Sequence, residues 1–251
     1  TLKDQGKLDE AIRAYKKALK HQPNYDAARN NLDLALKARG QLEAVTGKYN
    51  QDLSEQSIDP AVCFKAAFSL QKQGKLAEAI EFYEKVLSVD PEHSRTHYNL
   101  GLALQHQGDP EKAIEFYNKS LLSEPNFADA YYNKGCALKD LGLLEQAIEA
   151  YNHSISIKPD YAEAYNNIGI ALKRQGKLKD AIEAYKKSIF LKPDSAETHS
   201  NFGSALNALE EFGEAVNAFN KAIQLNPGQA ELYLNIGNAY TGLGQFEEAI
   251  T

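Results

Sequence analysis

The sequence predicts an all-α fold, a solenoid of antiparallel helix pairs. Prolines recur every 34 residues along most of the 251-residue chain, at Pro91, Pro125, Pro159, Pro193 and Pro227. Each unit between them is rich in helix-forming Ala, Leu, Glu and Lys, and most carry a glycine near the middle that divides the unit into two helices. Units of this size bury their apolar faces by stacking on their neighbours, so an array of helix pairs is expected.

Residues at equivalent positions of successive repeats form a column, and two further columns keep the same period. Small residues recur at Ala67, Gly101, Gly135, Gly169, Gly203 and Gly237. Aromatic residues recur at Tyr15, Tyr49, Tyr83, Tyr117, Tyr151, Tyr185 and Phe219. Columns that stay in phase over the whole sequence indicate one continuous array of repeats.

The signature of the tetratricopeptide repeat family is 34 residues long and combines a Leu-Gly pair, an aromatic residue, an alanine and a proline at fixed offsets. The sequence resembles that family over the whole chain. The resemblance implies a right-handed superhelix whose first helices line an inner, concave wall. It also implies that Gly169 and Ala181 lie where paired helices approach most closely. A glycine inside a helix costs about 1 kcal/mol relative to alanine, and close packing of the helices offsets that cost.

We expect a single repeat domain over residues 1–251. The chain begins without Met and shows no polar capping repeat at either end, which indicates a fragment of a longer protein. Full repeats are expected at 60–93, 94–127, 128–161, 162–195 and 196–229, a degenerate repeat at 26–59, and partial repeats at 1–25 and 230–251. The degenerate repeat carries Gly47, Asp52 and Ser57 where its second helix should pack and end, so a distorted helix is expected there.

Residues around each helix predict where it begins and ends. Asp59 precedes Pro60 and is expected to cap the next helix. Asp160 with Glu163, and Asp194 with Glu197, have the spacing of a capping box. Gly176 is expected to end the first helix of its repeat in the left-handed conformation.

Two residues depart from this pattern, and one pair of charged residues is spaced for an additional contact. Glu210 takes the turn position that other repeats give to glycine, so a turn of different shape is expected. Lys134 takes a column otherwise held by leucine, isoleucine or phenylalanine, and should lay its methylenes along the core with its amine in water. Glu183 and Lys187 are spaced for an i,i+4 ion pair on the second helix.

Composition excludes several classes of function. A net charge of −6 and a pI near 5.6 argue against nucleic-acid binding, which normally needs a basic face. No apolar run is long enough for membrane insertion. Cys63 and Cys136 fit no metal or redox spacing and are expected to be reduced, buried thiols of an intracellular, cytoplasmic protein.

The sequence offers no set of residues for catalysis. His93 and His97 can share a helix face, but a zinc site needs three or four ligands, and His97 recurs as His199 in a packing column. Carboxylates recur once per repeat at Glu81, Glu115, Glu149 and Glu183, as expected of a solvated face. We therefore expect no catalytic residue, no metal site and no cofactor.

One column of the expected inner wall is almost entirely asparagine. Its members are Asn31, Asn99, Asn133, Asn167, Asn201 and Asn235. Because an asparagine amide donates and accepts hydrogen bonds, it can pair with a peptide backbone of any sequence. The column resembles the asparagine ladder in the superhelical repeats of O-linked N-acetylglucosamine transferases. The alternative, which the sequence leaves open, is that asparagine here only supports helix packing.

Neighbouring positions of the same wall suggest the chemistry of a ligand. Phe64, Phe68, Tyr98 and Tyr132 form an aromatic stretch, and Lys72, Lys139 and Arg174 lie near the ends of first helices. A partner with acidic and apolar side chains is therefore favoured, the apolar anchors supplying affinity and the charges selectivity. Exposed lysines that only decorate the surface are the alternative.

The sequence thus predicts a non-enzymatic protein–protein interaction scaffold that binds an extended peptide or a helix of a partner protein in the concave groove. One alternative is the substrate-recruiting arm of a multidomain enzyme, such as an O-GlcNAc-type glycosyltransferase. Another is a chaperone adaptor, although Asp129, Glu163 and Glu197 occupy positions where its carboxylate clamp needs a lysine. Self-association through open repeat ends is also considered, because such ends expose apolar faces.

Overall fold

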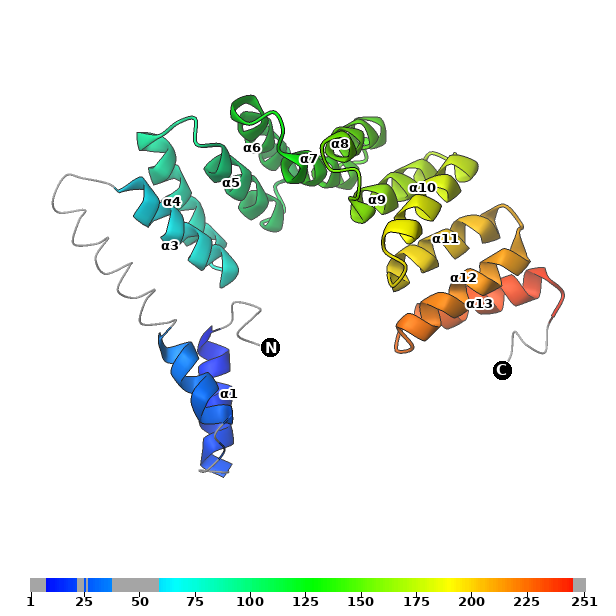
Figure 1. The fold of residues 1–251 in the computed structure, drawn as a ribbon, viewed down its shortest axis with the longest axis horizontal. Coiled ribbons are helices and arrows are strands. Elements are labelled where there is room, and N and C mark those ends of the chain that lie inside the picture. Colours follow the sequence, from blue (N-terminus) through cyan, green and yellow to red (C-terminus); the bar gives the residue numbers. More distant parts are fainter. Residues whose placement is uncertain (1–7, 22–24, 26, 38–58, 246–251) are drawn as a thin grey trace. The chain divides into compact units, whose positions relative to one another are not determined.

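The computed structural model describes residues 8–21, 25, 27–37 and 59–245, and every regular element within them is an α-helix (Figure 1). The helices are α1 (Leu8–His21), α3 (Pro60–Lys72), α4 (Leu76–Val89), α5 (Ser94–His106), α6 (Pro110–Ser123), α7 (Ala128–Asp140), α8 (Leu144–Ile157), α9 (Ala162–Arg174), α10 (Leu178–Leu191), α11 (Ala196–Ala208), α12 (Phe212–Leu225) and α13 (Ala230–Gly242). Residues 27–37 are also helical. The expected distortion at Gly47, Asp52 and Ser57 lies outside the described residues.

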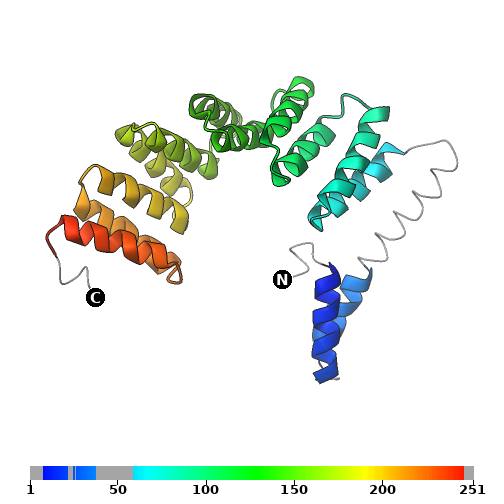
Figure 2. The same cartoon turned by 180° about the vertical axis from the view of Figure 1, so that it is seen from behind.

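The chain divides into two compact units, Thr1–Pro125 and Asn126–Thr251. Within each unit, consecutive helices pack as pairs: α3 with α4 and α5 with α6 in the first, and α7 with α8, α9 with α10 and α11 with α12 in the second. The members of each pair lie side by side in both views (Figures 1 and 2). Each pair also packs on the next pair of its unit, so the predicted all-α solenoid of helix pairs is confirmed.

We call α3, α5, α7, α9, α11 and α13 the first helices, and α4, α6, α8, α10 and α12 the second helices. Each first helix contacts the next first helix of its unit, as α7 contacts α9 and α9 contacts α11. Residues on the first helices of one unit therefore lie close enough to act together.

The helix starts confirm one predicted cap and correct two others. Asp59 caps α3, because its Oδ1 accepts hydrogen bonds from the backbone N–H of Ala61 at 2.8 Å and of Val62 at 3.3 Å. Asp160 and Asp194 are not caps. Their helices begin one residue further along than the sequence suggested, which leaves both carboxylates outside the capping position. The cap of α11 is Ser195, whose Oγ accepts from the Thr198 N–H at 3.2 Å.

Among the described residues, the turn inside each repeat has one shape, including the repeat that lacks glycine. Gly176 has φ of +76° and the next N–H, of Lys177, donates to the Leu172 carbonyl at 3.0 Å. Glu210 has φ of +62° and the N–H of Glu211 donates to the Leu206 carbonyl at the same distance. The expected difference in shape at Glu210 is therefore wrong, because the closing hydrogen bonds hold glutamate in the conformation that glycine adopts freely.

Replacing Glu210 with glycine is expected to stabilise the protein by about 1 kcal/mol. A residue with a Cβ is destabilised by roughly 1–2 kcal/mol in the left-handed region, and glycine avoids this cost. The greater conformational freedom of glycine in the unfolded chain cancels part of the resulting stabilisation. Urea unfolding of Glu210→Gly measures the change, and Glu210→Ala, which keeps the Cβ, should show no such gain. If the glycine variant were no more stable than the alanine variant, the left-handed conformation of Glu210 would not be strained.

The small column lies against the aromatic column of the same pair. A Cβ added to Gly169 would lie 2.7 Å from Cδ1 of Tyr185, and a Cβ added to Gly135 would lie 2.7 Å from Cδ1 of Tyr151. Both tyrosines are fully buried. The predicted close approach at Gly169 is thus confirmed, and the group that requires it is a ring on the second helix.

Lys134 differs from the equivalent apolar residues in its surroundings. Leu100, Ile168 and Ile236 are buried in that column, whereas Lys134 is half-buried. Burial lowers the pKa of the Lys134 amine, and the nearby Glu149 carboxylate acts in the opposite direction. The lysine therefore sits partly out of water, in agreement with methylenes that follow the core.

Candidate functional site

The asparagine column runs along the first helices, as the repeat pattern predicts. Asn31 is exposed, Asn133, Asn201 and Asn235 are half-buried, and Asn99 and Asn167 are buried. The column is therefore not uniformly open to solvent, and its amides differ in what they contact.

Two of the amides bond within their own helices. Asn99 Nδ2 donates to the Arg95 carbonyl at 2.7 Å, and Asn133 Nδ2 donates to the Asp129 carbonyl at 2.9 Å. Each bond reaches back one helical turn and takes one of the two N–H groups of its amide. The amide oxygen accepts nothing in these two bonds.

Two other amides join neighbouring first helices of the second unit. Asn167 Nδ2 on α9 donates to the Tyr132 hydroxyl on α7 at 3.0 Å, and its Oδ1 accepts from Lys139 Nζ at 3.2 Å. Asn201 Nδ2 on α11 donates to Asn166 Oδ1 on α9 at 3.1 Å. These side chains therefore hold three successive first helices in register with one another.

Further bonds extend the same surface. Asn166 Nδ2 donates to Glu197 Oε1 at 3.3 Å, and Lys173 Nζ donates to Ser204 Oγ at 2.6 Å. We call the set of Tyr132, Lys139, Asn166, Asn167, Lys173, Glu197, Asn201 and Ser204 the first-helix network. Burial lowers the pKa of Lys173, so its ammonium is only partly hydrated.

Asn166 was not among the predicted site residues. It takes the column that holds the aromatic residues Phe64, Tyr98 and Tyr132 in earlier repeats. The available signal was the consecutive pair Asn166–Asn167, which occurs in this repeat and turns an aromatic position into a second amide.

Aromatic rings line the start of this surface in the second unit. Tyr132 stacks on Tyr161 with ring centroids 4.7 Å apart and lies 5.8 Å from the ring of Tyr151. The Tyr161 hydroxyl donates to Asp129 Oδ1 at 3.0 Å. Burial raises the pKa of Tyr132, so its hydroxyl stays protonated and can still donate while it accepts from Asn167.

The first unit brings three other predicted residues together on α3. Phe64 and Phe68 stack with centroids 6.5 Å apart, and Lys72 Nζ lies 4.4 Å above the Phe68 ring. Phe68 is 41% exposed, which leaves an aromatic face with an adjacent cation. Tyr98 on α5 lies 6.1 Å from the ring of Tyr117. Phe64, Phe68 and Lys72 are therefore neighbours on α3, whereas the ring contact of Tyr98 is with Tyr117 on α6.

The remaining predicted residues stand apart. Arg174 is exposed at the end of α9, and Asn235 is half-buried on α13. Among the residues that the structure describes, no hydrogen bond joins either one to the first-helix network. Their part in binding stays a prediction.

The histidines have structural partners. His97 Nε2–H donates to the Pro91 carbonyl at 2.7 Å, and His199 Nε2–H donates to the Pro193 carbonyl at 2.9 Å. The shared column therefore fastens the start of a first helix to the preceding proline, as the structural interpretation predicted. His93 Nδ1 accepts from the Thr96 N–H at 3.2 Å and caps α5.

Within the described ranges, no group of three or more histidine, cysteine or acidic side chains is placed to hold a metal ion. Burial raises the pKa of both Cys63 and Cys136, which disfavours the reactive thiolate. No helix in this part of the chain is both long and apolar enough to span a bilayer.

Models of known protein families match the chain along its repeats. Family models described as tetratricopeptide repeats match residues 1–44, 63–121, 116–149, 135–176, 162–195 and 203–244. No curated protein matches the chain.

Several solved structures resemble it. A crystal structure of MamA is 32% identical, covers 66% of this chain and 96% of its own, and has a TM-score of 0.61. YrrB, described as a TPR protein with an unusual peptide-binding site, is 22% identical, covers 76% of this chain and 96% of its own, and has a TM-score of 0.62. PilF of Pseudomonas aeruginosa is 20% identical, and the match covers 76% of this chain and 87% of PilF, with a TM-score of 0.68. The last two likenesses concern the fold alone.

Proposed function

Because the chain belongs to the tetratricopeptide repeat family, we propose that it is a protein-interaction scaffold whose first helices bind an extended segment or a helix of a partner protein. The observation that carries the proposal is the first-helix network of the second unit. It gathers an aromatic ring, two amines and three amides on adjoining helices. The peptide-binding site that is reported for YrrB lends support from a protein of the same fold.

The chemistry of the network favours particular groups on the ligand. Asn201 uses one N–H in its bond to Asn166, and its amide oxygen is an acceptor that can pair with a peptide group. Lys173 has a hydroxyl partner, and Lys139 an amide partner, so both amines remain able to bind a carboxylate. Tyr132 offers a half-buried ring for an apolar anchor. A partner segment with acidic and apolar side chains fits this set.

The amides also stabilise the protein, which decides how the proposal is tested. Asn167 joins α7 to α9, so its removal disturbs the fold and the surface together. Asn133 is half-buried and bonds to Asp129 within its own helix, so Asn133→Ala removes an amide from the surface without breaking either bond of Asn167 between α7 and α9.

Peptide-array binding of Asn133→Ala and of the double variant with Asn201→Ala tests the function. We expect the tightest array ligands to lose about tenfold in affinity per amide, which corresponds to about 1.4 kcal/mol. The matched control is Asn152→Ala, which removes an exposed asparagine of the second helix α8. Unchanged affinity for every ligand, in variants that unfold at the wild-type temperature, would refute binding by this column.

The enzyme-arm alternative, the cytoplasmic location and self-association through repeat ends remain predictions. None of the contacts described above favours them over the scaffold.

A further inference from the structure

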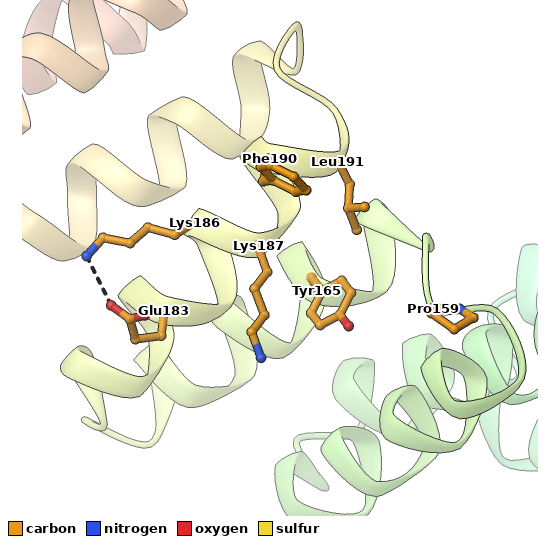
Figure 3. A pocket seen from close by; sticks show the side chains of 7 residues that line it. All are labelled: Pro159, Tyr165, Glu183, Lys186, Lys187, Phe190 and Leu191. Atoms are coloured by element: carbon orange, nitrogen blue, oxygen red, sulfur yellow. Dashed lines mark hydrogen bonds and ion pairs between the residues drawn. The ribbon is translucent and has the colours of Figure 1, made fainter.

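A second surface, on the second helices, also has the features of a binding site. A hollow of about 320 Å³ lies in the second unit against α10 and is shown in Figure 3. It is lined by Pro159, Tyr165, Glu183, Lys186, Lys187, Phe190 and Leu191. We call it the α10 hollow. None of its lining residues belongs to the first-helix network, so it is separate from the proposed peptide site.

One wall of the α10 hollow is apolar and open to solvent. Phe190 is 85% exposed and Leu191 is 37% exposed, with Pro159 and Tyr165 beside them (Figure 3). Burying a phenylalanine side chain is favourable, and this residue forgoes that gain in the free protein. The repeat does not require an apolar residue there, because the same position holds Ser156 in α8 and Gln224 in α12.

The hollow also carries a cation without a carboxylate partner. Lys186 Nζ pairs with Glu183 Oε1 at 3.0 Å, so the predicted pairing of Glu183 with Lys187 is wrong. Lys187 instead places its ammonium 5.7 Å from the centroid of the Tyr165 ring, near the outer limit for such an interaction. Within the described ranges it makes no ion pair, so its charge is available to a ligand.

The same combination occurs in the first unit, two repeats earlier. A hollow of about 360 Å³ is lined by Leu87, Pro91, Glu92, His97, Phe116, Lys119 and Leu122. Lys119 and Leu122 take the positions of Lys187 and Phe190. Lys119 Nζ lies 4.6 Å from the Phe116 centroid, and Leu122 is 80% exposed. The association of an exposed apolar side chain with a ring-bound lysine is therefore not confined to one place in the chain.

We propose that the α10 hollow docks an acidic segment of a partner protein, with an aromatic or aliphatic side chain seated against Phe190 and Leu191 and a carboxylate on Lys187. The charges support this occupant over a basic one, because the unpaired group at the apolar wall is an ammonium. The seated side chain displaces water from both groups, which strengthens the ion pair relative to an exposed one.

The test uses the full chain, labelled with ¹⁵N, and a synthetic octapeptide that alternates aspartate with leucine and phenylalanine. We expect amide shifts around Lys187 and Phe190 that saturate with peptide concentration. Peptides with lysine in place of aspartate, or with serine in place of the apolar residues, should bind at least tenfold more weakly. Shifts confined to the first helices would overturn the proposal and support the first-helix site, whereas the absence of saturable shifts around Lys187 and Phe190 would overturn it whatever the first helices do.

Matched variants separate docking from folding. Lys187→Glu and Phe190→Ser are expected to weaken binding of the octapeptide at least tenfold. Lys221→Glu and Gln224→Ser, at the equivalent positions of α12, should leave that binding unchanged. All four positions are exposed, so stability should stay near the wild-type value. Equal binding by all four variants would refute the site. Loss of self-association in Phe190→Ser, with no peptide binding by the wild type, would identify a second copy as the occupant and also refute it.

Discussion

Gly169→Ala is expected to destabilise the protein by roughly 1–3 kcal/mol, the usual range for overpacking a core. Helix propensity alone predicts the opposite, a gain of about 1 kcal/mol. The clash decides the sign, because the new methyl would lie 2.7 Å from Tyr185 Cδ1 and the ring is fully buried between helices. Urea unfolding followed by circular dichroism measures the effect.

Two controls accompany the Gly169 substitution. Gly213→Ala adds a methyl to α12 where nothing lies within 4 Å, and should be neutral or slightly stabilising. Combining Gly169→Ala with Tyr185→Leu removes the ring that the methyl meets. The double variant should then be more stable than the sum of the two single effects predicts. A Gly169→Ala protein that is more stable than the wild type would show that the helices move apart at no cost.

Tyr185→Ala has the largest expected effect, a loss of about 3–5 kcal/mol, because it removes a fully buried ring from the contact between α9 and α10. Tyr185→Phe should instead be neutral or stabilising by up to about 1 kcal/mol. The Tyr185 hydroxyl is buried and has no hydrogen-bond partner among the described residues, and such a group costs free energy. Phe219 already fills the equivalent position in the next repeat.

Tyr117→Phe supplies the comparison. The Tyr117 hydroxyl donates to Gln105 Oε1 at 2.8 Å, so its loss should cost about 1 kcal/mol. Thermal or urea unfolding of the two phenylalanine variants therefore gives opposite signs. A Tyr185→Phe protein that loses as much as Tyr117→Phe would mean that the Tyr185 hydroxyl has a partner in solution.

Periodicity was sufficient to predict the fold because the same packing of helices recurs from repeat to repeat. The family resemblance implied a close approach of helices at Gly169, whereas the contact with the Tyr185 ring, which recurs between Gly135 and Tyr151, is known only from the coordinates. The capping predictions at Asp160 and Asp194 were wrong, since a shift of one residue in a helix start decides which side chain reaches the free N–H groups. The handedness of the superhelix stays a prediction.

The candidate site was predictable as a face but not as a set of contacts. Columns identify the first-helix positions, yet they do not show that Asn167 bonds to Tyr132 or that Asn201 bonds to Asn166. Those pairs join residues 35 apart, and side-chain rotamers select them. Lys187 illustrates the same limit, because a ring on another helix competes with the local carboxylate for its ammonium.

Binding of a polypeptide by the first helices can be measured by an NMR titration of the full chain with the tightest peptide from the array, followed on the side-chain amide signals of asparagine. We expect the Nδ2 resonances of Asn133 and Asn201 to shift with one saturation curve, together with backbone signals around Tyr132. Saturable binding that leaves these resonances unmoved would show that the peptide binds elsewhere on the chain.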